Sequence, residues 1–155
     1  MMPLLVKKTF LFAVFLLVLF SCKKKDVISQ ATADENKITK YLTDNNLDAT
    51  ATGTGLYYII SAPGSGIQPN AKSDVTVNYK GYLIDGSVFD QSKSGGYTTN
   101  LNSVIKGWQE GVPLIKKGGK IKLIIPSALG YGASAAGSIP ANSVLVFDIE
   151  LMNVL

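Results

Sequence analysis

Aromatic side chains and one carboxylate are the residues of this chain that could form an active site. The only tryptophan, Trp108, lies in the stretch VIKGWQEG, between two glycines and after two β-branched residues. Histidine is absent and Cys22 is the single cysteine, so Ser-His-Asp and Cys-His catalysis and the commonest zinc sites are excluded. The carboxylates have no EF-hand or similar spacing. We therefore expect no metal and no cofactor.

Strands and turns are predicted for most of the chain from Leu56 onward. The predicted strands cover residues 56–61, 73–84, 87–90, 120–126 and 143–154. Asp85-Gly86 is a strong hairpin signal between the second and the third of these strands. One short helix is expected at residues 108–115, after Gly107. Many strands with one short helix favour an α+β domain whose sheet packs one face against that helix.

Two further segments have patterns of their own. Residues 34–47 place Ile38, Tyr41 and Leu42 at helical spacing and predict a short amphipathic helix. Its apolar face either packs on the domain, which is the simpler interpretation, or forms a dimer contact. Residues 127–142 are rich in Gly, Ala and Ser and too long for a tight turn. Loops of this length are usually functional or disordered.

The first 22 residues have the composition of an export signal. Lys7 and Lys8 precede the apolar run of residues 10–20, which is too short to span a bilayer as a permanent helix. Ser21, a small residue, then precedes Cys22. This pattern resembles a bacterial lipoprotein signal, in which Cys22 becomes the lipidated first residue. An ordinary secretory signal with an incidental cysteine is the alternative.

Positive charge is concentrated around that signal. All 15 basic residues are lysines, and five of them flank the apolar run, so the 10 that remain face 11 acids. The body of the protein from Asp26 onward is thus close to neutral. Phosphate binding requires a basic face, and the sequence therefore indicates no nucleic-acid partner.

Three segments together resemble the FKBP-type peptidyl-prolyl cis-trans isomerases. In chain order they are VTVNYKGYLIDGSVFDQS, VIKGWQEGVPLIKKGGKIKLIIP and LGYGASAAGSIPANSVLVFDIEL. The resemblance covers residues 56–155 and implies the FKBP-like α+β fold, an antiparallel half-wrapped β-sheet around one short α-helix. It also implies a pocket for a prolyl side chain, and an enzyme that rotates X-Pro peptide bonds in exported or unfolded proteins.

The same resemblance implies a role for each pocket residue. Trp108 would form the floor, Asp90 would lie at the edge, and the Tyr131 hydroxyl and the Ile105 backbone N–H would each meet a substrate carbonyl. The residues expected to be catalytic are Tyr79, Asp90, Ile105, Trp108 and Tyr131. Those expected to bind substrate are Phe89, Tyr97, Val104, Ile139 and Phe147. Each aromatic taken singly could instead fill the core of a small sheet, and only the ordered combination favours a pocket.

Other functions remain possible for the same residues. A non-catalytic chaperone module could use the pocket to hold proline-containing segments. A surface interaction protein could keep the scaffold with an idle pocket, although the large aromatics that are present speak against this.

For the whole chain, the sequence predicts four parts. They are a lipoprotein signal peptide at residues 1–21, a tether at 22–33, a short helical lead segment at 34–55 and the isomerase domain at 56–155. We expect a monomer in the cell envelope of a bacterium, anchored to a membrane through lipid on Cys22. The expected membrane is the outer membrane, and the protein would lie on its periplasmic face or on its surface face. The expected partners are proline-containing polypeptides and the macrolide inhibitors of the family.

Overall fold

The computed structural model describes residues 29–155. The predicted signal segment and the lipidation of Cys22 lie outside the described residues. Within residues 29–155, no helix has both the length and the apolar composition that crossing a membrane requires.

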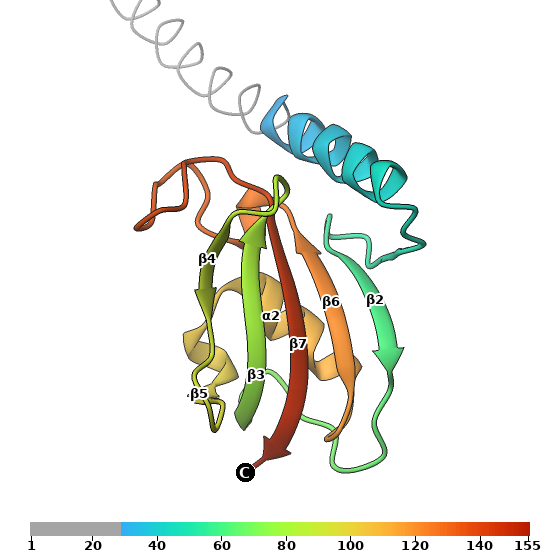
Figure 1. Cartoon of the computed structure of the whole chain (residues 1–155), viewed down its shortest axis with the longest axis vertical. Helices are drawn as coiled ribbons and strands as arrows, with labels where there is room; N and C mark the ends of the chain where they lie inside the picture. Colours follow the sequence, from blue (N-terminus) through green and yellow to red (C-terminus); the bar gives the residue numbers. More distant parts are fainter. Residues whose placement is uncertain (1–28) are drawn as a thin grey trace, which may run out of the picture.

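An antiparallel sheet of seven strands forms the body of this region (Figure 1). The strands are β1 (Thr50–Ala51), β2 (Tyr57–Ala62), β3 (Asp74–Leu83), β4 (Val88–Gln91), β5 (Tyr97–Asn100), β6 (Lys120–Ile125) and β7 (Leu145–Val154). Their order across the sheet is β1-β2-β6-β7-β3-β4, and β5 also pairs with β3. Strands β4 and β5 pair with opposite ends of β3, at residues 80–82 and 74–77 respectively. The sheet is thus continued on that side by two short strands with a break between them.

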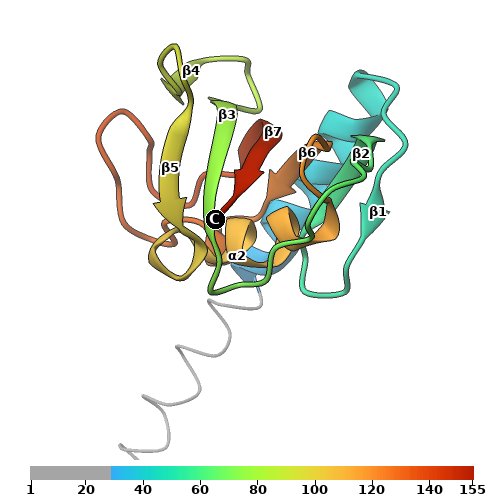
Figure 2. The same ribbon diagram turned by 90° about the horizontal axis from the view of Figure 1, so that it is seen from below.

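One short helix, α2 (Lys106–Gly111), lies against one face of this sheet (Figure 2). Three single turns of 3₁₀-helix accompany it in the chain, η1 (Leu101–Ser103), η2 (Val112–Leu114) and η3 (Ser127–Leu129). The helix ends at Gly111. The Val112 backbone N–H still donates to the Trp108 carbonyl, but Pro113 has no backbone N–H with which to continue the series, and η2 follows. A sheet with one short helix on its face confirms the predicted α+β fold class.

The main core lies between α2 and the inner face of the sheet. Alternate residues of a strand point to opposite faces, so Leu123 and Ile125 of β6 and Phe147 of β7 join one cluster with Trp108 of α2. A Cβ atom at Gly107 would come within 2.6 Å of Ile125. Because Gly107 carries no side chain, α2 can lie directly on β6 and place the Trp108 ring among the strands.

A second helix covers the outer face at one end of the sheet. This N-terminal helix is described from residue 29 to residue 44. Its Ile38 is fully buried against Ile124 and Val146, with Tyr41 and Leu42 packed around them. The predicted apolar stripe therefore packs on its own domain.

The N-terminal helix includes residues before position 34, where the predicted helix starts. Residues 29–33, expected to belong to a tether, are helical, because the helix is held at this end by polar contacts of its own side chains with the domain. The lead segment of residues 34–55 also contributes a strand, β1, which pairs with β2.

Candidate active site

Trp108 stands at the centre of a cluster of aromatic rings. Its ring meets those of Tyr79 on β3 and Phe147 on β7 edge to face, with centroids 5.1 Å and 5.3 Å away. Phe89 on β4 meets Phe147 in the same way at 5.4 Å. Edge-to-face contacts at these distances are the favoured arrangement of aromatic pairs. The rings therefore fix one another and form a rigid apolar floor.

A cavity of about 500 Å³ lies over this floor and opens to solvent. Its volume is within the range of roughly 300 to 1,000 Å³ found for small-ligand sites. All the residues that the sequence predicts for the pocket line this cavity: Tyr79, Phe89, Asp90, Tyr97, Val104, Ile105, Trp108, Tyr131, Ile139 and Phe147. Segments far apart in the chain thus contribute to one site. Trp108 is only 4% exposed, so its ring belongs to both the core and the cavity.

A glycine on β3 allows the two phenylalanines to pack. Gly81 pairs with Asp90 of β4 on one side and with Phe147 of β7 on the other. A Cβ atom at Gly81 would lie 2.6 Å from Phe89 and 2.7 Å from Phe147, closer than real side chains approach. The missing side chain of Gly81 thus leaves the space in which the wall of the cavity forms.

Tyr79 and Asp90 form a hydrogen-bonded pair at the cavity edge. The Tyr79 hydroxyl donates to Asp90 Oδ2 at 2.6 Å, and the Gln91 backbone N–H donates to Asp90 Oδ1 at 2.9 Å. Burial, and then the hydrogen bond to Asp90, raise the pKa of Tyr79 above the ordinary tyrosine value. Tyr79 therefore keeps its proton to higher pH than an ordinary tyrosine, and Asp90 holds its hydroxyl in place.

The Ile105 amide supplies a free donor on the other side of the cavity. The Ile105 carbonyl accepts from the backbone N–H of Trp108 at 3.0 Å and of Gln109 at 3.2 Å, while the Gln109 side chain donates to the Val104 carbonyl at 2.8 Å. The backbone N–H of Ile105 itself donates to no group among residues 29–155. The segment is thus fixed by its carbonyls, and its N–H can bind a carbonyl of another chain.

The loop of residues 127–142 closes the remaining side of the cavity. Ala136 and Ile139 exchange two backbone hydrogen bonds of 2.9 Å around a tight turn, in which Gly137 has a φ of 57°. This turn holds Ile139 at 5% exposure. Tyr131 is 43% exposed, and its hydroxyl makes no hydrogen bond within residues 29–155. The loop is therefore ordered and presents an apolar side chain and a free hydroxyl.

Four further lining residues have no counterpart in the sequence predictions. They are Ser103, Ala136, Gly137 and Ser138. Small residues in loops carry no chemical signal in a sequence, and their presence here follows from backbone position alone. Among residues 29–155, no three His, Cys, Asp or Glu side chains gather as metal ligands would.

Known proteins resemble this chain in both sequence and fold. A family model described as FKBP-type peptidyl-prolyl cis-trans isomerase matches residues 65–152. The FKBP-type peptidyl-prolyl cis-trans isomerase FkpA of Buchnera aphidicola (subspecies Schizaphis graminum) is 54% identical over 106 residues, which are 66% of this chain and 42% of the relative. FkpA of Escherichia coli K12 is 50% identical over 105 residues, 66% of this chain and 39% of the relative.

The solved structures include a similar fold over nearly the whole chain. The crystal structure of FkpA from Escherichia coli superposes with a TM-score of 0.72 at 38% identity, and the match covers 96% of this chain and 71% of that one. The chain spans less than half the length of the curated relatives named above.

Proposed function

The chain belongs to the FKBP-type peptidyl-prolyl cis-trans isomerase family, and we propose that it catalyses the cis-trans rotation of X-Pro peptide bonds in unfolded or exported polypeptides. The observation that carries the proposal is the cavity with Trp108 as its floor, lined by the predicted residues from six separate segments. The prolyl ring of a substrate would lie on the aromatic cluster. The substrate residues on either side of the proline would run across the cavity rim.

The reaction needs no nucleophile. Rotation about an amide breaks no covalent bond, and its barrier of about 18 to 20 kcal/mol comes from the lost resonance of the planar form. The twisted amide has less charge separation than the planar amide. An apolar cavity that excludes water therefore favours the twisted form relative to the planar ground state. A millionfold acceleration would require about 8 kcal/mol of such preference.

Directed hydrogen bonds would hold the substrate while its amide twists. The free N–H of Ile105 would bind a carbonyl beside the proline, and the free hydroxyl of Tyr131 would bind a second one. Asp90 would act through Tyr79, whose ring forms part of the wall beside Trp108. These roles require hydrogen-bond donors at the cavity and no free acid or base, and the carboxylate that lines it, Asp90, accepts a hydrogen bond from Tyr79.

The direct test measures isomerisation of a proline tetrapeptide by the protein from residue 23 onward. We expect the rate to exceed that in buffer and to fall when Asp90 is replaced in Asp90→Ala. Glu150→Ala is the control, because Glu150 on β7 pairs with Lys120 outside the cavity. A wild-type rate equal to that in buffer would refute the enzymatic proposal. Binding of the peptide without acceleration would instead support a module that holds proline-containing segments.

We also propose that the protein works in a bacterial cell envelope, anchored through lipid on Cys22. The support is the sequence of residues 1–22, in which a lysine pair and an apolar run end at a small residue and the only cysteine. One acyl chain binds membranes only marginally, whereas several chains give a stable anchor.

Macrolide inhibitors of the family are expected to bind in the cavity over Trp108.

The anchor is tested by replacing the cysteine. Cys22→Ala should lose incorporation of labelled fatty acid and should leave the membrane fraction of the cell. Ser21→Ala, which keeps a small residue at the preceding position, should retain both properties. Unchanged labelling of Cys22→Ala would show that the lipid is attached elsewhere.

A further inference from the structure

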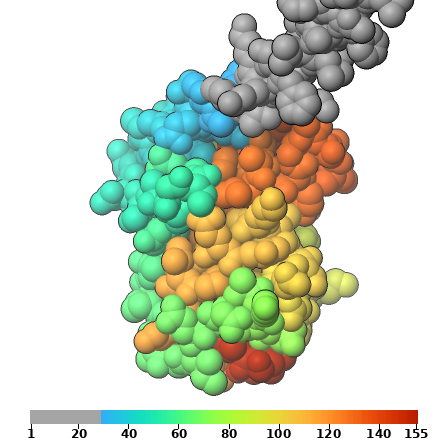
Figure 3. All heavy atoms as spheres, turned by 180° about the vertical axis from the view of Figure 1, so that it is seen from behind, coloured from blue at the N-terminus to red at the C-terminus, as the bar shows by residue number. Residues whose placement is uncertain are grey.

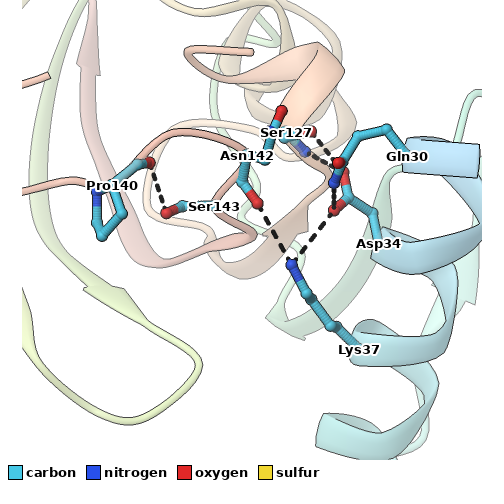
Figure 4. Close-up of polar contacts among 7 residues, drawn as sticks. All are labelled: Gln30, Asp34, Lys37, Ser127, Pro140, Asn142 and Ser143. Atoms are coloured by element: carbon cyan, nitrogen blue, oxygen red, sulfur yellow. Dashed lines mark hydrogen bonds and ion pairs between the residues drawn. The ribbon is translucent and has the colours of Figure 1, made fainter. Parts of the chain in front are cut away.

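A carboxylate of the N-terminal helix is buried against the loop that carries Tyr131. Asp34 is 1% exposed. Its Oδ2 accepts from the backbone N–H of Ser127 at 2.8 Å and from the Ser127 hydroxyl at 2.6 Å. Its Oδ1 accepts from the Gln30 side chain at 2.8 Å, and Lys37 Nζ lies 3.9 Å from that oxygen. Figure 4 shows Gln30 and Lys37 reaching Asp34 from the same helix and Asp34 reaching Ser127.

Ser127 connects Asp34 by hydrogen bonds to both neighbours of Tyr131. The Ser127 carbonyl accepts from the backbone N–H of Gly130 at 3.0 Å and of Gly132 at 2.8 Å. Gly130 and Gly132 directly precede and follow Tyr131 in the chain. Asp34 therefore lies two hydrogen bonds away from the backbone on each side of the tyrosine that lines the cavity.

The other end of the loop is tied to the same helix. The Gly132 carbonyl accepts from the backbone N–H of Asn142 at 2.8 Å, and Lys37 donates to the Asn142 carbonyl at 3.4 Å. The helix lies beside residues 127–142 when the molecule is seen from the front and from behind (Figures 1 and 3). The helix thus holds the beginning and the end of the loop at one place.

Stability alone does not require a charged group here. A buried charge costs desolvation, and well-packed apolar residues often stabilise a fold as well or better. The first turn of η3 has no side-chain cap of its own, because Pro126 occupies the N-cap position. A carboxylate that accepts two bonds from Ser127 fixes the direction of this turn, which apolar packing would not do.

We propose that Asp34 is a positioning residue for the isomerase, which fixes Ser127 and through it the orientation of Tyr131 at the cavity. The inference rests on the function proposed above. It assigns to the N-terminal helix a role in the reaction, although none of its described residues, 29–44, lines the cavity.

The first test compares two equal substitutions on the same helix. Asp34→Asn keeps the shape but loses the charge and replaces one of the two acceptor oxygens with an NH2 donor, so Ser127 and Gln30 can no longer both donate to this side chain in the native arrangement. Asp44→Asn is the control, since Asp44 is exposed and, among residues 29–155, pairs with Lys40 alone. We expect kcat/KM of Asp34→Asn to fall about tenfold and that of Asp44→Asn to stay within about twofold.

A double-mutant cycle separates positioning from a general loss of structure. If Asp34 acts through Tyr131, adding Asp34→Asn to Tyr131→Phe should lower kcat/KM by less than about twofold further. A full and additional tenfold loss in the Tyr131→Phe protein would overturn the proposal, because the effect would then not pass through that hydroxyl.

Hydrogen exchange tests the same connection without any activity. In Asp34→Asn and in Ser127→Ala, the amide protons of Gly130 and Gly132 should exchange about tenfold faster than in the wild type, and those of β7 should not. Ser127→Ala keeps its backbone N–H and serves if Asp34→Asn does not fold. Unchanged exchange at both glycines in the folded variants would overturn the positioning role. A wild type without isomerase activity would instead refute only the function, so the two failures are distinguishable.

Discussion

Single residues of this protein belong to the core and to the cavity at the same time. Trp108 packs with buried Leu123, Ile125 and Phe147, and its exposed edge forms the cavity floor. Its indole Nε1 is buried and has no hydrogen-bond partner among residues 29–155. The ring is therefore held by apolar and aromatic contacts, and its role is one of shape.

Truncation of Trp108 should therefore reduce stability and binding together. We expect Trp108→Ala to lower the free energy of unfolding by about 3 to 5 kcal/mol, because a cavity replaces the ring, and to weaken binding of a proline peptide. Trp108→Phe should cost less, since the indole N–H that it removes makes no hydrogen bond to any of residues 29–155. Urea unfolding and peptide titration measure the two effects.

Ile124→Ala is the matched control for that experiment. Ile124 is fully buried but lies in the cluster under the N-terminal helix. Its truncation should lower stability and leave peptide affinity nearly unchanged. Equal losses of affinity in Trp108→Ala and Ile124→Ala would mean that the ring has no special part in the site.

The large pocket residues could be identified from the sequence because their types and order are unusual together. Trp108, Asp90 and Tyr131 each stand in a segment of the family pattern. The role of the Ile105 backbone N–H was predicted only from the family resemblance. Every residue except proline has a backbone N–H, and only the fold decides which one stays unpaired. Asp34 was not predicted to have any role, because an acid near the start of a helix is usually exposed.

At the scale of elements, the close approach of α2 to β6 decides where the cavity lies. Gly107 and Gly111 are one helical turn apart and face the sheet. A Cβ atom at Gly107 would lie 2.6 Å from Ile125, and one at Gly111 would lie 2.5 Å from Leu123. The pair therefore brings the helix backbone onto the strand.

We expect Gly107→Ala to destabilise the protein although alanine favours helices. Alanine gains about 1 kcal/mol over glycine in a helix interior, but the new methyl group must push α2 away from Ile125 and shift Trp108. The unfolding free energy and the peptide affinity should both fall. Lys106→Ala, at an exposed position of the same turn, should change neither by more than a few tenths of a kcal/mol. A more stable Gly107→Ala protein would contradict the packing described here.

The elements that the sequence predicted best are the long strands. Strands β3, β6 and β7 carry runs of β-branched and apolar residues, and their burial patterns follow those runs. Strand β5, of sequence YTTN, was missed because its polar residues lie at the sheet edge and give no apolar signal. The N-terminal helix begins earlier than predicted because contacts of Asp34 and Gln30, and not apolar spacing, hold its first turns.

The contact between the N-terminal helix and the sheet should weaken at high pH. Burial raises the pKa of Tyr41 and that of Tyr82 to about 12 each. In the unfolded chain these groups lose their protons near pH 10, while the native protein still holds them. The unfolded state is then favoured as pH rises. Stability should be complete below pH 10 and should fall between pH 10 and 12.

Unfolding of the Tyr41→Phe and Tyr82→Phe variants measures this effect. Each variant should show a shallower fall of unfolding free energy with pH than the wild type, whatever its stability at pH 7. The remaining slope should belong in part to Tyr79, whose pKa is also raised. A slope in both variants as steep as in the wild type would contradict this assignment.

At the scale of the whole molecule, the N-terminal helix uses its apolar face within its own chain. Ile38 is fully buried against Ile124, Val144 and Val146. The polar side of the helix carries charged groups such as Lys40 and Asp44. Because the apolar stripe of residues 29–44 is already covered, this described part of the helix leaves no large apolar surface for a second copy. This arrangement favours the monomer that the sequence predicts.

We therefore expect the protein from residue 23 onward to sediment as one chain, independent of concentration. Ile38→Asp tests the same argument, because it places a charge in the buried cluster and should release the helix from the sheet. That variant should have a lower free energy of unfolding than the wild type. Both proteins should sediment with the mass of one chain. A wild-type dimer that Ile38→Asp converts to a monomer would mean that Ile38 joins two copies, and the packing of the helix on its own sheet would then be wrong.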